Sequence, residues 1–457
     1  MKPQTLDMTA GKPTRLIIHF ALPLMLANVF QQLYTVVDTA IVGKALGVDA
    51  LAALGAADWL NWMMYGMVQG LTQGFSIPVA QNFGARQADQ LRKTVGASIV
   101  LSAVSSLLLI ALLQLAIDPV LTLLQTPAQI ADGSKLYLRI MFAGVPIVMA
   151  YNLFAGILRS LGDSKTPLMA MVAASLLNIG LDLLFVLVFR WGIAGAAVAT
   201  LLAQVFAALF CLYFLLRNAE MRLRKEDFRL DWPFALRLLK LGSPMAFQNG
   251  IISVGGMILQ FVVNGFGVVF IAGYTATNKL YGILEIAAIS YGYSTATFTG
   301  QNLGAGQIGR IRQGHRASLV LSLVTSAIIG LIMILFGKFI LSGFLSGDPV
   351  EVAAALDVGY RYLTLMSLFL PVLYILHVER SCLQGMGNTV LPMASGIAEF
   401  VMRTGAAFLL PGIIGDAGIF WAEVLAWAGA DLILIPSYFV IIRKCTNSAK
   451  CLPLVDI

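Results

Sequence analysis

Twelve long apolar segments constrain the fold of this chain more than any other feature. An α-helix needs roughly 20 apolar residues to cross a lipid bilayer. The segments are continuously apolar and lack the two-residue alternation of barrel strands. The sequence therefore predicts an all-α membrane protein with twelve transmembrane helices, at about 16–43, 51–82, 94–117, 136–160, 167–190, 192–216, 236–264, 268–299, 316–343, 358–384, 391–411 and 417–442.

The composition excludes several classes of protein. The chain is 59% hydrophobic and 12% charged, whereas soluble domains are about 45–50% apolar and about 25% charged. A net charge of +7 in such a chain belongs on cytoplasmic loops and not on a nucleic-acid-binding face. The four cysteines have no metal-ligand spacing, and the three histidines lie far apart in the sequence. We therefore expect no enzyme, no cofactor, no metal centre and no nucleic-acid partner.

The lysines and arginines predict the orientation in the membrane. If both termini are cytoplasmic, 21 of the 30 basic residues lie on that side and 6 on the other, as the positive-inside rule requires. We therefore expect a multi-pass protein of the plasma (inner) membrane, with both termini in the cytoplasm. The basic stretch from Arg217 to Lys240 follows the sixth helix and suits contact with anionic lipid. It separates an N-terminal lobe (1–216) from a C-terminal lobe (236–457), with a cytoplasmic linker at 217–235.

The two halves repeat one another. The motif QNFGA at 81–85 recurs 220 residues later as QNLGA at 301–305, and Pro23 corresponds to Pro244. Each half has an even number of predicted spans, so both halves have the same orientation in the membrane. Parallel repeats of this kind place a substrate site between two bundles that move against each other. The sequence thus predicts two pseudo-symmetric six-helix bundles around a central cavity.

Two acidic residues in the N-terminal half are the main functional candidates, since ionisable groups inside a membrane are costly and by default functional. At 1.5 Å per residue, Asp38 lies about 7 Å and Asp182 about 12 Å below the outer ends of their helices. Tyr34 and Asn178 precede them by four residues and share their helix faces. Thr200 lies at a similar depth, and we expect these residues to form one buried cluster with Asn152, which is nearer the midplane.

The predicted cluster suits reversible binding of a small cation. Low-dielectric surroundings and a second carboxylate both favour the neutral form of an acid, so the pair can exchange a proton. With the oxygens of Asn178 and Thr200, the same carboxylates could equally hold Na⁺, which prefers hard oxygen ligands. Pro23 removes a backbone hydrogen bond from the first helix and is the expected hinge.

The C-terminal half lacks this cluster, because Leu259 and Ala407 occupy the positions of the two acids. Glu399 and Arg403 are spaced to pair with each other on one helix. Glu379 and Arg380 lie near a helix end and can reach the interface, and Asp58, Glu423 and Asp431 receive no role. The remaining candidates for the substrate cavity, each of which could instead serve packing, are Gln31, Met63, Met64, Met67, Lys279, Glu285, His377 and Arg403.

Several motifs together carry a resemblance to a known family. They are Pro23 with QQLYTVVDT at 31–39, QNFGA at 81–85, LRSLGD at 158–163 and NIGLD at 178–182. On these motifs the chain resembles the multidrug and toxic compound extrusion (MATE) transporters, and is nearest to their DinF-like bacterial branch.

The resemblance implies two six-helix lobes and a V-shaped cavity. It also implies export of amphipathic, often cationic, drugs against inward H⁺ or Na⁺, and a cation site at Asp38, Asp182, Tyr34, Asn152, Asn178 and Thr200. The NorM-like branch carries acids in its seventh and tenth helices, where this chain is apolar near Ile252 and Leu373, so coupling is expected in the N-terminal lobe alone.

An alternative function stays open at this point. A flippase for lipids or lipid-linked sugars would share the two-lobed repeat, but would line its cavity with several cations, for which Lys279 and Arg403 are the available candidates. In either case we expect a monomer whose partners are small amphipathic molecules and the lipid bilayer.

Overall fold

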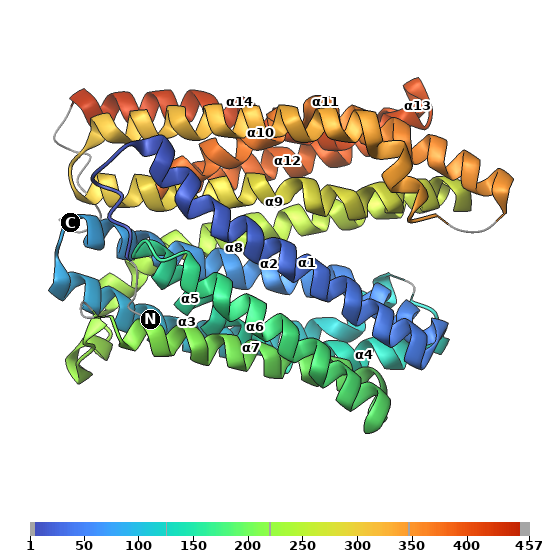
Figure 1. Ribbon diagram of the computed structural model, residues 1–457, viewed down its shortest axis with the longest axis horizontal. Coiled ribbons are helices and arrows are strands. Elements are labelled where there is room, and N and C mark those ends of the chain that lie inside the picture. Colours follow the sequence, from blue (N-terminus) through green and yellow to red (C-terminus); the bar gives the residue numbers. More distant parts are fainter. Residues whose placement is uncertain (1–4, 125, 219–220, 346–347, 448–457) are drawn as a thin grey trace.

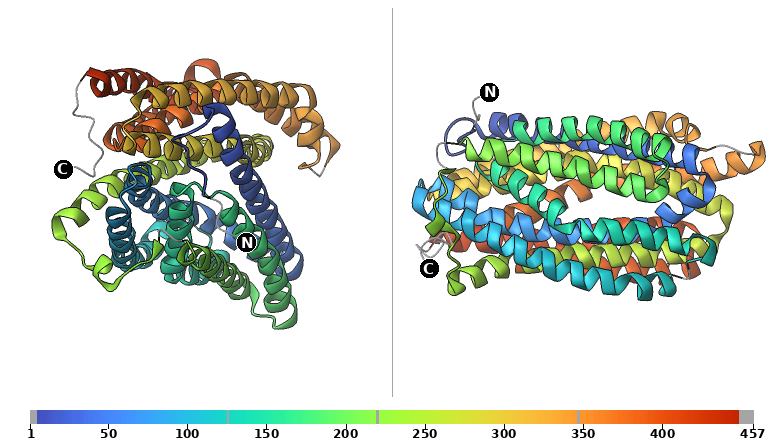
Figure 2. Two further views of the ribbon diagram at one scale, coloured as in Figure 1. Left: turned by 60° about the vertical axis from the view of Figure 1, so that its left-hand side comes forward. Right: turned by 90° about the horizontal axis from the view of Figure 1, so that it is seen from below.

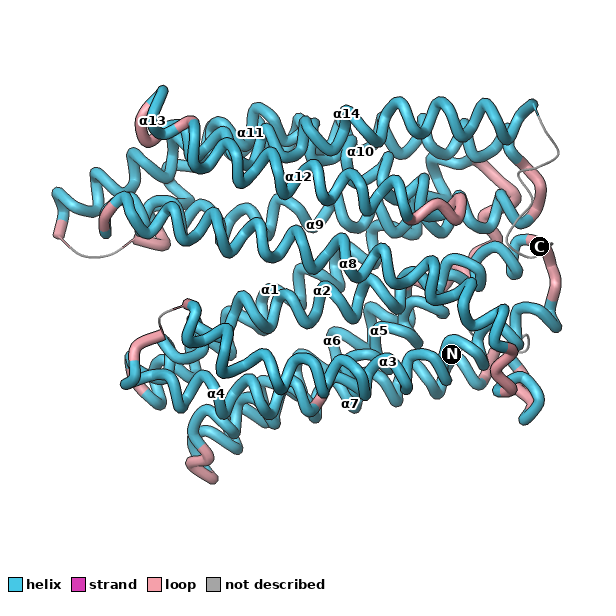
Figure 3. The backbone as a smooth tube through the Cα atoms, turned by 180° about the vertical axis from the view of Figure 1, so that it is seen from behind, coloured by secondary structure: helices cyan, strands magenta, loops and turns pink. Residues whose placement is uncertain are grey.

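The computed structural model describes residues 5–124, 126–218, 221–345 and 348–447. Helices make up nearly all of these residues, and no strand occurs among them (Figure 3). Lys2 and Lys450, which contributed to the predicted orientation, lie outside the described residues, as do both chain ends. The all-α prediction is confirmed.

The N-terminal half consists of the helices α1 (Pro13–Leu46), α2 (Val48–Gly84), α3 (Ala88–Leu123), α4 (Ala128–Ala143), α5 (Val145–Ser160), α6 (Lys165–Asp182), the π-helix η1 (Leu183–Val188) and α7 (Gly192–Leu216). After the short 3₁₀ turn η3 (Lys225–Phe228), the C-terminal half consists of α8 (Trp232–Val263), the 3₁₀ turn η4 (Asn264–Phe266), α9 (Val268–Gly304), α10 (Ile308–Ser342), α11 (Pro349–Gly385), α12 (Val390–Leu409), α13 (Pro411–Ile414) and α14 (Ala417–Asn447).

Each of the twelve predicted spans coincides with one helical run. The span predicted at 136–160 consists of α4 and α5, which meet at a bend of 48°. Pro146 lies at the start of α5, where its missing N–H cannot continue the preceding helix. Nine described helices are long and apolar enough to cross a membrane, and the bent pair makes ten. The other two predicted spans are α2 and α9, which pack against each other at the centre of the molecule.

The helices form two bundles, α2–α7 and α9–α14, below called the N bundle and the C bundle (Figures 1 and 2). Each bundle has its own hydrophobic core. The first part of α1, up to Leu24, packs into the core of the C bundle, whereas Ala27 and Tyr34 pack into the N bundle. The crossing point lies between Met25 and Ala27, about one turn after Pro23. In the other repeat, α8 begins in the N bundle and ends in the C bundle.

The described part of the linker between the halves packs against α3. The backbone of η3 packs so tightly on α3 that a Cβ atom on Gly96 would lie 2.1 Å from the carbonyl oxygen of Asp227. Arg92 of α3 also lies 3.8 Å from the Asp227 carboxylate. The division into lobes at 216 and 236 stays a prediction. The structure adds that α1 and α8 each pack in both bundles.

The two copies of the repeated motif meet at one end of the molecule, which we call the motif end. A Cβ atom on Gly84 would lie 1.9 Å from the carbonyl oxygen of Gln301, and one on Gly304 would lie 1.9 Å from that of Gln81. The Gln81 amide donates to the carbonyl of Gly385 at 3.1 Å, and the Gln301 amide donates to that of Ser160 at 2.8 Å. The bundles are therefore in backbone contact at this end.

Candidate cation-binding site

The two predicted acids come together from different helices of the N-terminal half. Asp38 is on α1, which packs along α6, and Asp182 is the last residue of α6. The two side chains lie within interaction distance of each other. The π-helix η1 begins directly after Asp182. Such π-turns are frequent at functional sites, because the wider turn changes the direction of the side chains around it.

Most side-chain polar atoms of Asp38, Asn178 and Asp182 have no hydrogen-bond partner of good geometry among the described residues. Asp182 is fully buried and Asn178 is 1% exposed. Both carboxylate oxygens of Asp182, both amide atoms of Asn178 and Oδ1 of Asp38 are buried without a hydrogen bond. Buried polar groups are almost always paired, and each unpaired one costs about 1–3 kcal/mol. Five such atoms in one place indicate a site that is completed by something other than the protein.

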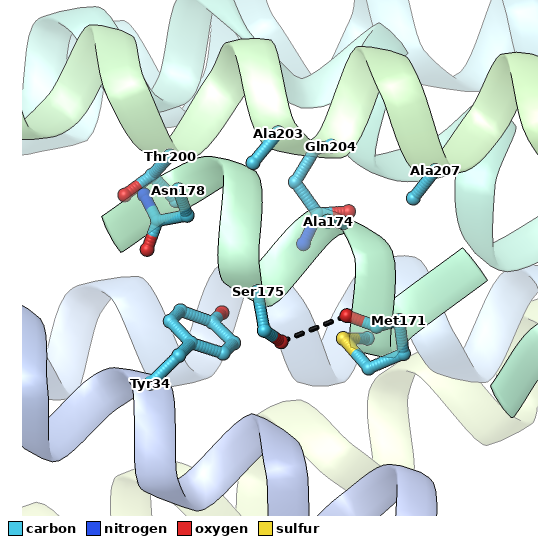
Figure 4. A pocket seen from close by; sticks show the side chains of 9 residues that line it. All are labelled: Tyr34, Met171, Ala174, Ser175, Asn178, Thr200, Ala203, Gln204 and Ala207. Atoms are coloured by element: carbon cyan, nitrogen blue, oxygen red, sulfur yellow. Dashed lines mark hydrogen bonds between the residues drawn. The ribbon is translucent and has the colours of Figure 1, made fainter. Parts of the chain in front are cut away.

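A small cavity opens at Asn178, one turn before Asp182 on α6, and neither Asp38 nor Asp182 lines it (Figure 4). It offers about 10 Å³ of space to the centre of a water molecule, which is roughly what one bound water requires. Tyr34 faces it from α1, Asn178 and Ser175 from α6, and Thr200 and Gln204 from α7. The cavity therefore suits a water or a small cation and is too small for an organic substrate.

The structure brings together most of the predicted cluster. Tyr34, Asn178 and Thr200 line the cavity, which neither acid lines. The place of Asn152 in this cluster stays a prediction; its amide donates to the carbonyl of Val148 in its own helix at 2.8 Å. Gln204 was not predicted. Its Oε1 is buried without a partner, and its position one turn after Thr200 on the same helix face is the signal that could have identified it.

The charged residues of the C bundle form a connected network. Arg403 binds Glu399 at 3.2 Å and Glu423 at 2.9 Å, and Arg380 binds the second oxygen of Glu399 at 2.7 Å. The expected pairing of Glu399 with Arg403 is confirmed. Arg403 is 5% exposed, so its assignment to the substrate cavity is corrected to a structural ion pair. Glu423, which received no role, is a full member of the network.

Two further pairs lie in the C bundle, and the first of them differs from the expectation. Glu379 does not reach the membrane interface, because it is buried and bonded to His315 at 2.8 Å. His377 lies 3.5 Å from Glu285, and both side chains remain partly accessible. Of the cavity candidates in this half, Glu285 and His377 are partly open, and Lys279 is exposed.

The methionine cluster is mainly part of a core. Met64 is fully buried in the N bundle, so its assignment to the substrate cavity was wrong. Met63 and Met67 are partly buried and pack against the same core. Gln31 is partly exposed on α1, one turn before the hydroxyl of Thr35, which donates to its carbonyl. Among the described residues, no group of three or more His, Cys, Asp or Glu side chains is arranged to hold a metal ion.

Comparison with known proteins identifies the family. The family model MatE matches residues 23–184 and 244–409, one block in each half of the chain. The chain belongs to the MATE family. The assignment to its DinF-like branch stays a prediction.

Similar proteins support the family assignment. The chain is 29% identical over 418 residues to the probable multidrug resistance protein YpnP of Bacillus subtilis, covering 90% of this chain and 92% of that protein. It is 26% identical to the probable multidrug resistance protein NorM of Thermotoga maritima, with 86% and 85% covered, and 25% identical to the FAD transporter of Shewanella oneidensis, with 73% and 75% covered. The MATE family and these relatives are transporters rather than enzymes.

The solved structures confirm the fold. An outward-facing multidrug resistance MATE transporter superposes with a TM-score of 0.89 at 22% identity, covering 98% of this chain and all of that one. A MATE crystal structure in complex with MaL6 also gives 0.89, with 97% of this chain covered. The prediction of twelve transmembrane helices in a MATE-like fold is thereby confirmed, and the chain is a multi-pass membrane protein.

Proposed function

We propose that this MATE transporter exports amphipathic, often cationic, organic molecules by alternating access, in exchange for H⁺ or Na⁺ bound at Asp38 and Asp182. The names of the multidrug resistance relatives support this substrate class. The small cavity at Asn178, one turn from Asp182, is consistent with a small coupling ion, since its volume admits an ion or a water and no drug.

The single observation that carries the proposal is the set of unpartnered polar atoms on Asp38, Asn178 and Asp182. A protein that used these residues only as polar contacts between helices would pair them, because an unpaired buried group destabilises the fold. A proton on one carboxyl would let it donate a hydrogen bond to the other and would remove a charge. A sodium ion would instead take the carboxylate oxygens together with the amide oxygen of Asn178 and the hydroxyl of Thr200.

Binding of the cation can act on helix α1. This helix carries Asp38 and Tyr34 in the N bundle and passes into the C bundle about one turn from Pro23. A change of one charge at Asp38 alters the contacts of the half of α1 that packs in the N bundle. The contacts of the other half stay unchanged. A ligand shifts an equilibrium between two conformations only if it binds them with different affinity, and a neutralised site favours the conformation that buries it. Pro23 is the proposed hinge for this motion.

The charge pattern supports an orientation for this transporter. We assign the motif end to the cytoplasm, so that Arg86 and Arg310 beside the two repeated motifs obey the positive-inside rule. With the motif end closed, we expect the substrate path between the bundles to open to the outside. The flippase alternative is less well supported. Arg403, one of its two candidate cations, is held between Glu399 and Glu423.

Dye efflux from cells tests the proposal. Asp182→Asn should abolish export of ethidium while the protein reaches the membrane in normal amount. Asp118→Asn is the matched control, because that carboxylate is exposed at 2.7 Å from Lys135, and exposed pairs contribute little. Export by Asp182→Asn at the rate of Asp118→Asn would contradict the proposed role of the site.

A further inference from the structure

The segment that precedes α1, Leu6–Gly11, lies across the motif end and touches both bundles. Met8 in its centre is fully buried and belongs to the core of the C bundle. A peptide that merely led into the first helix would have no need to bury its side chain at the point where the two bundles meet. The contacts of this segment therefore need a separate explanation.

On the side of the C bundle, the segment is bound through its backbone. The N–H of Met8 donates to Oε1 of Gln301 at 2.9 Å. Its carbonyl accepts from the Asn302 amide at 3.1 Å and from Arg310 at 3.0 Å. Arg310 also donates to the carbonyl of Gly11 at 3.0 Å and to Oδ1 of Asn302 at 2.9 Å. Charge-assisted hydrogen bonds of this kind are stronger than neutral ones.

On the side of the N bundle, the segment contacts the turn between α5 and α6. The N–H of Leu6 donates to the carbonyl of Gly162 at 3.3 Å. The approach is so close that a Cβ atom on Gly162 would lie 2.1 Å from the carbonyl oxygen of Leu6. Gly162 has a φ of +86°, which favours glycine in any case. Asp7 adds an exposed ion pair to Arg86 at 3.6 Å.

The glutamine that receives Met8 also joins the two bundles. While its Oε1 accepts from Met8, the Nε2 of Gln301 donates to the carbonyl of Ser160 on α5 at 2.8 Å. Ser160 is itself buried beneath this contact. A movement that separates the bundles at the motif end must break the bond from Gln301 to Ser160 and must also detach Leu6–Gly11 from one bundle or the other.

We propose that Leu6–Gly11 is a latch that holds the motif end closed and is released each time the transporter opens to that side. This inference rests on the alternating access of the proposed function. The latch adds bonds that exist only in the closed conformation, so it raises the population of that conformation. Weakening the latch should shift the population towards the conformation that is open at the motif end.

Cysteine accessibility tests the latch without any transport. Ser160→Cys places a thiol beneath the closed contact, in the full-length chain with Cys382, Cys445 and Cys451 replaced by serine and with Cys211 retained. Cys211 is fully buried within the N bundle and reports general unfolding. Labelling of both positions by a water-soluble maleimide is followed by mass spectrometry in detergent-solubilised protein.

Two variants weaken the latch from opposite partners. Arg310→Ala removes its hydrogen bonds to Met8 and Gly11, and Met8→Ala removes the buried side chain while leaving the backbone bonds in place. Each variant should raise the labelling rate of position 160 about tenfold. The loss of the hydrogen bonds or of the buried side chain changes the equilibrium between the closed and the open motif end by about that factor. The matched control is Arg312→Ala, on the same helix, whose guanidinium binds Thr446 instead.

The possible results decide between the latch and its absence. A rise at position 160 in both variants, with Cys211 slow and Arg312→Ala unchanged, supports the latch. Labelling at the rate of the Arg312→Ala control, or an equal rise at Cys211, contradicts it. Since the assay needs neither substrate nor ion gradient, the latch can fail while Asp182→Asn still abolishes efflux, and the coupling site can fail while the latch is supported.

Discussion

The carbonyl oxygen of Gln301 lies only 1.9 Å from where a Cβ atom of residue 84 would be, so Gly84 permits the two repeated motifs to meet backbone to backbone. Gly304 and Gln81 make the same contact in the other direction. The repeated motif is thus explained by a contact between its two copies. The motif end can close because residues 84 and 304 are glycines, which leave room for the facing backbone.

Gly84→Ala should therefore weaken the closed motif end. The added methyl group forces the backbones apart, and overpacking of this kind typically costs about 1–3 kcal/mol. We expect a lower melting temperature in detergent. Gly309→Ala is the control, since a Cβ atom there meets nothing within 4 Å and alanine suits a helix better than glycine. Equal melting temperatures for the two variants would show that the contact is not tight.

Asn178→Leu should separate activity from stability. Leucine has a similar volume and removes two buried polar atoms that have no partner, which relieves a cost of about 1–3 kcal/mol. We expect an unchanged or higher melting temperature, together with at least a tenfold loss of dye efflux.

Ser175→Ala is the companion of this variant. Its hydroxyl lines the same cavity but is already bonded to the carbonyl of Met171 at 2.8 Å, as Figure 4 shows. It should retain efflux. A clear loss of stability in Asn178→Leu would mean that the amide has a partner in the folded protein, and the argument from unpaired atoms would fail.

Arg403→Met should destabilise the C bundle strongly. It leaves Glu399 with one partner and Glu423 without one, and breaking a buried ion pair costs about 3–5 kcal/mol. Arg361→Met, which removes an exposed arginine from Asp357 and Asp416, should cost about 0–1 kcal/mol. Thermal unfolding of the two variants in detergent compares these effects. The double variant Arg403→Met with Glu423→Gln should recover part of the lost stability. No recovery would show that the pairing of Glu423 with Arg403 contributes little to stability.

The meeting of Asp38 and Asp182 could be predicted from the sequence, whereas their depth in the membrane stays a prediction. Helices that cross a bilayer have a fixed rise per residue, so counting residues from the helix ends predicts similar depths for Asp38 and Asp182. The twelve spans and the repeat follow from the same regularity and from the recurrence of QNFGA as QNLGA.

Neighbours across helices were harder to predict, because periodicity indicates the face of a helix and not what packs against it. Met64 therefore looked like a cavity residue although it is core. The passage of α1 between the bundles also leaves no local pattern. Glu423 and Gln204 gain their meaning only from partners that are distant in the chain.

Transport in proteoliposomes, with H⁺ and Na⁺ gradients imposed separately, tests the central claim most directly. We predict that one of the two gradients alone drives uptake of a cationic dye by the unaltered protein, and that Asp38→Asn and Asp182→Asn each reduce this gradient-driven uptake to the level of protein-free liposomes. Gradient-driven uptake at the unaltered rate by either variant would show that the cation is carried elsewhere.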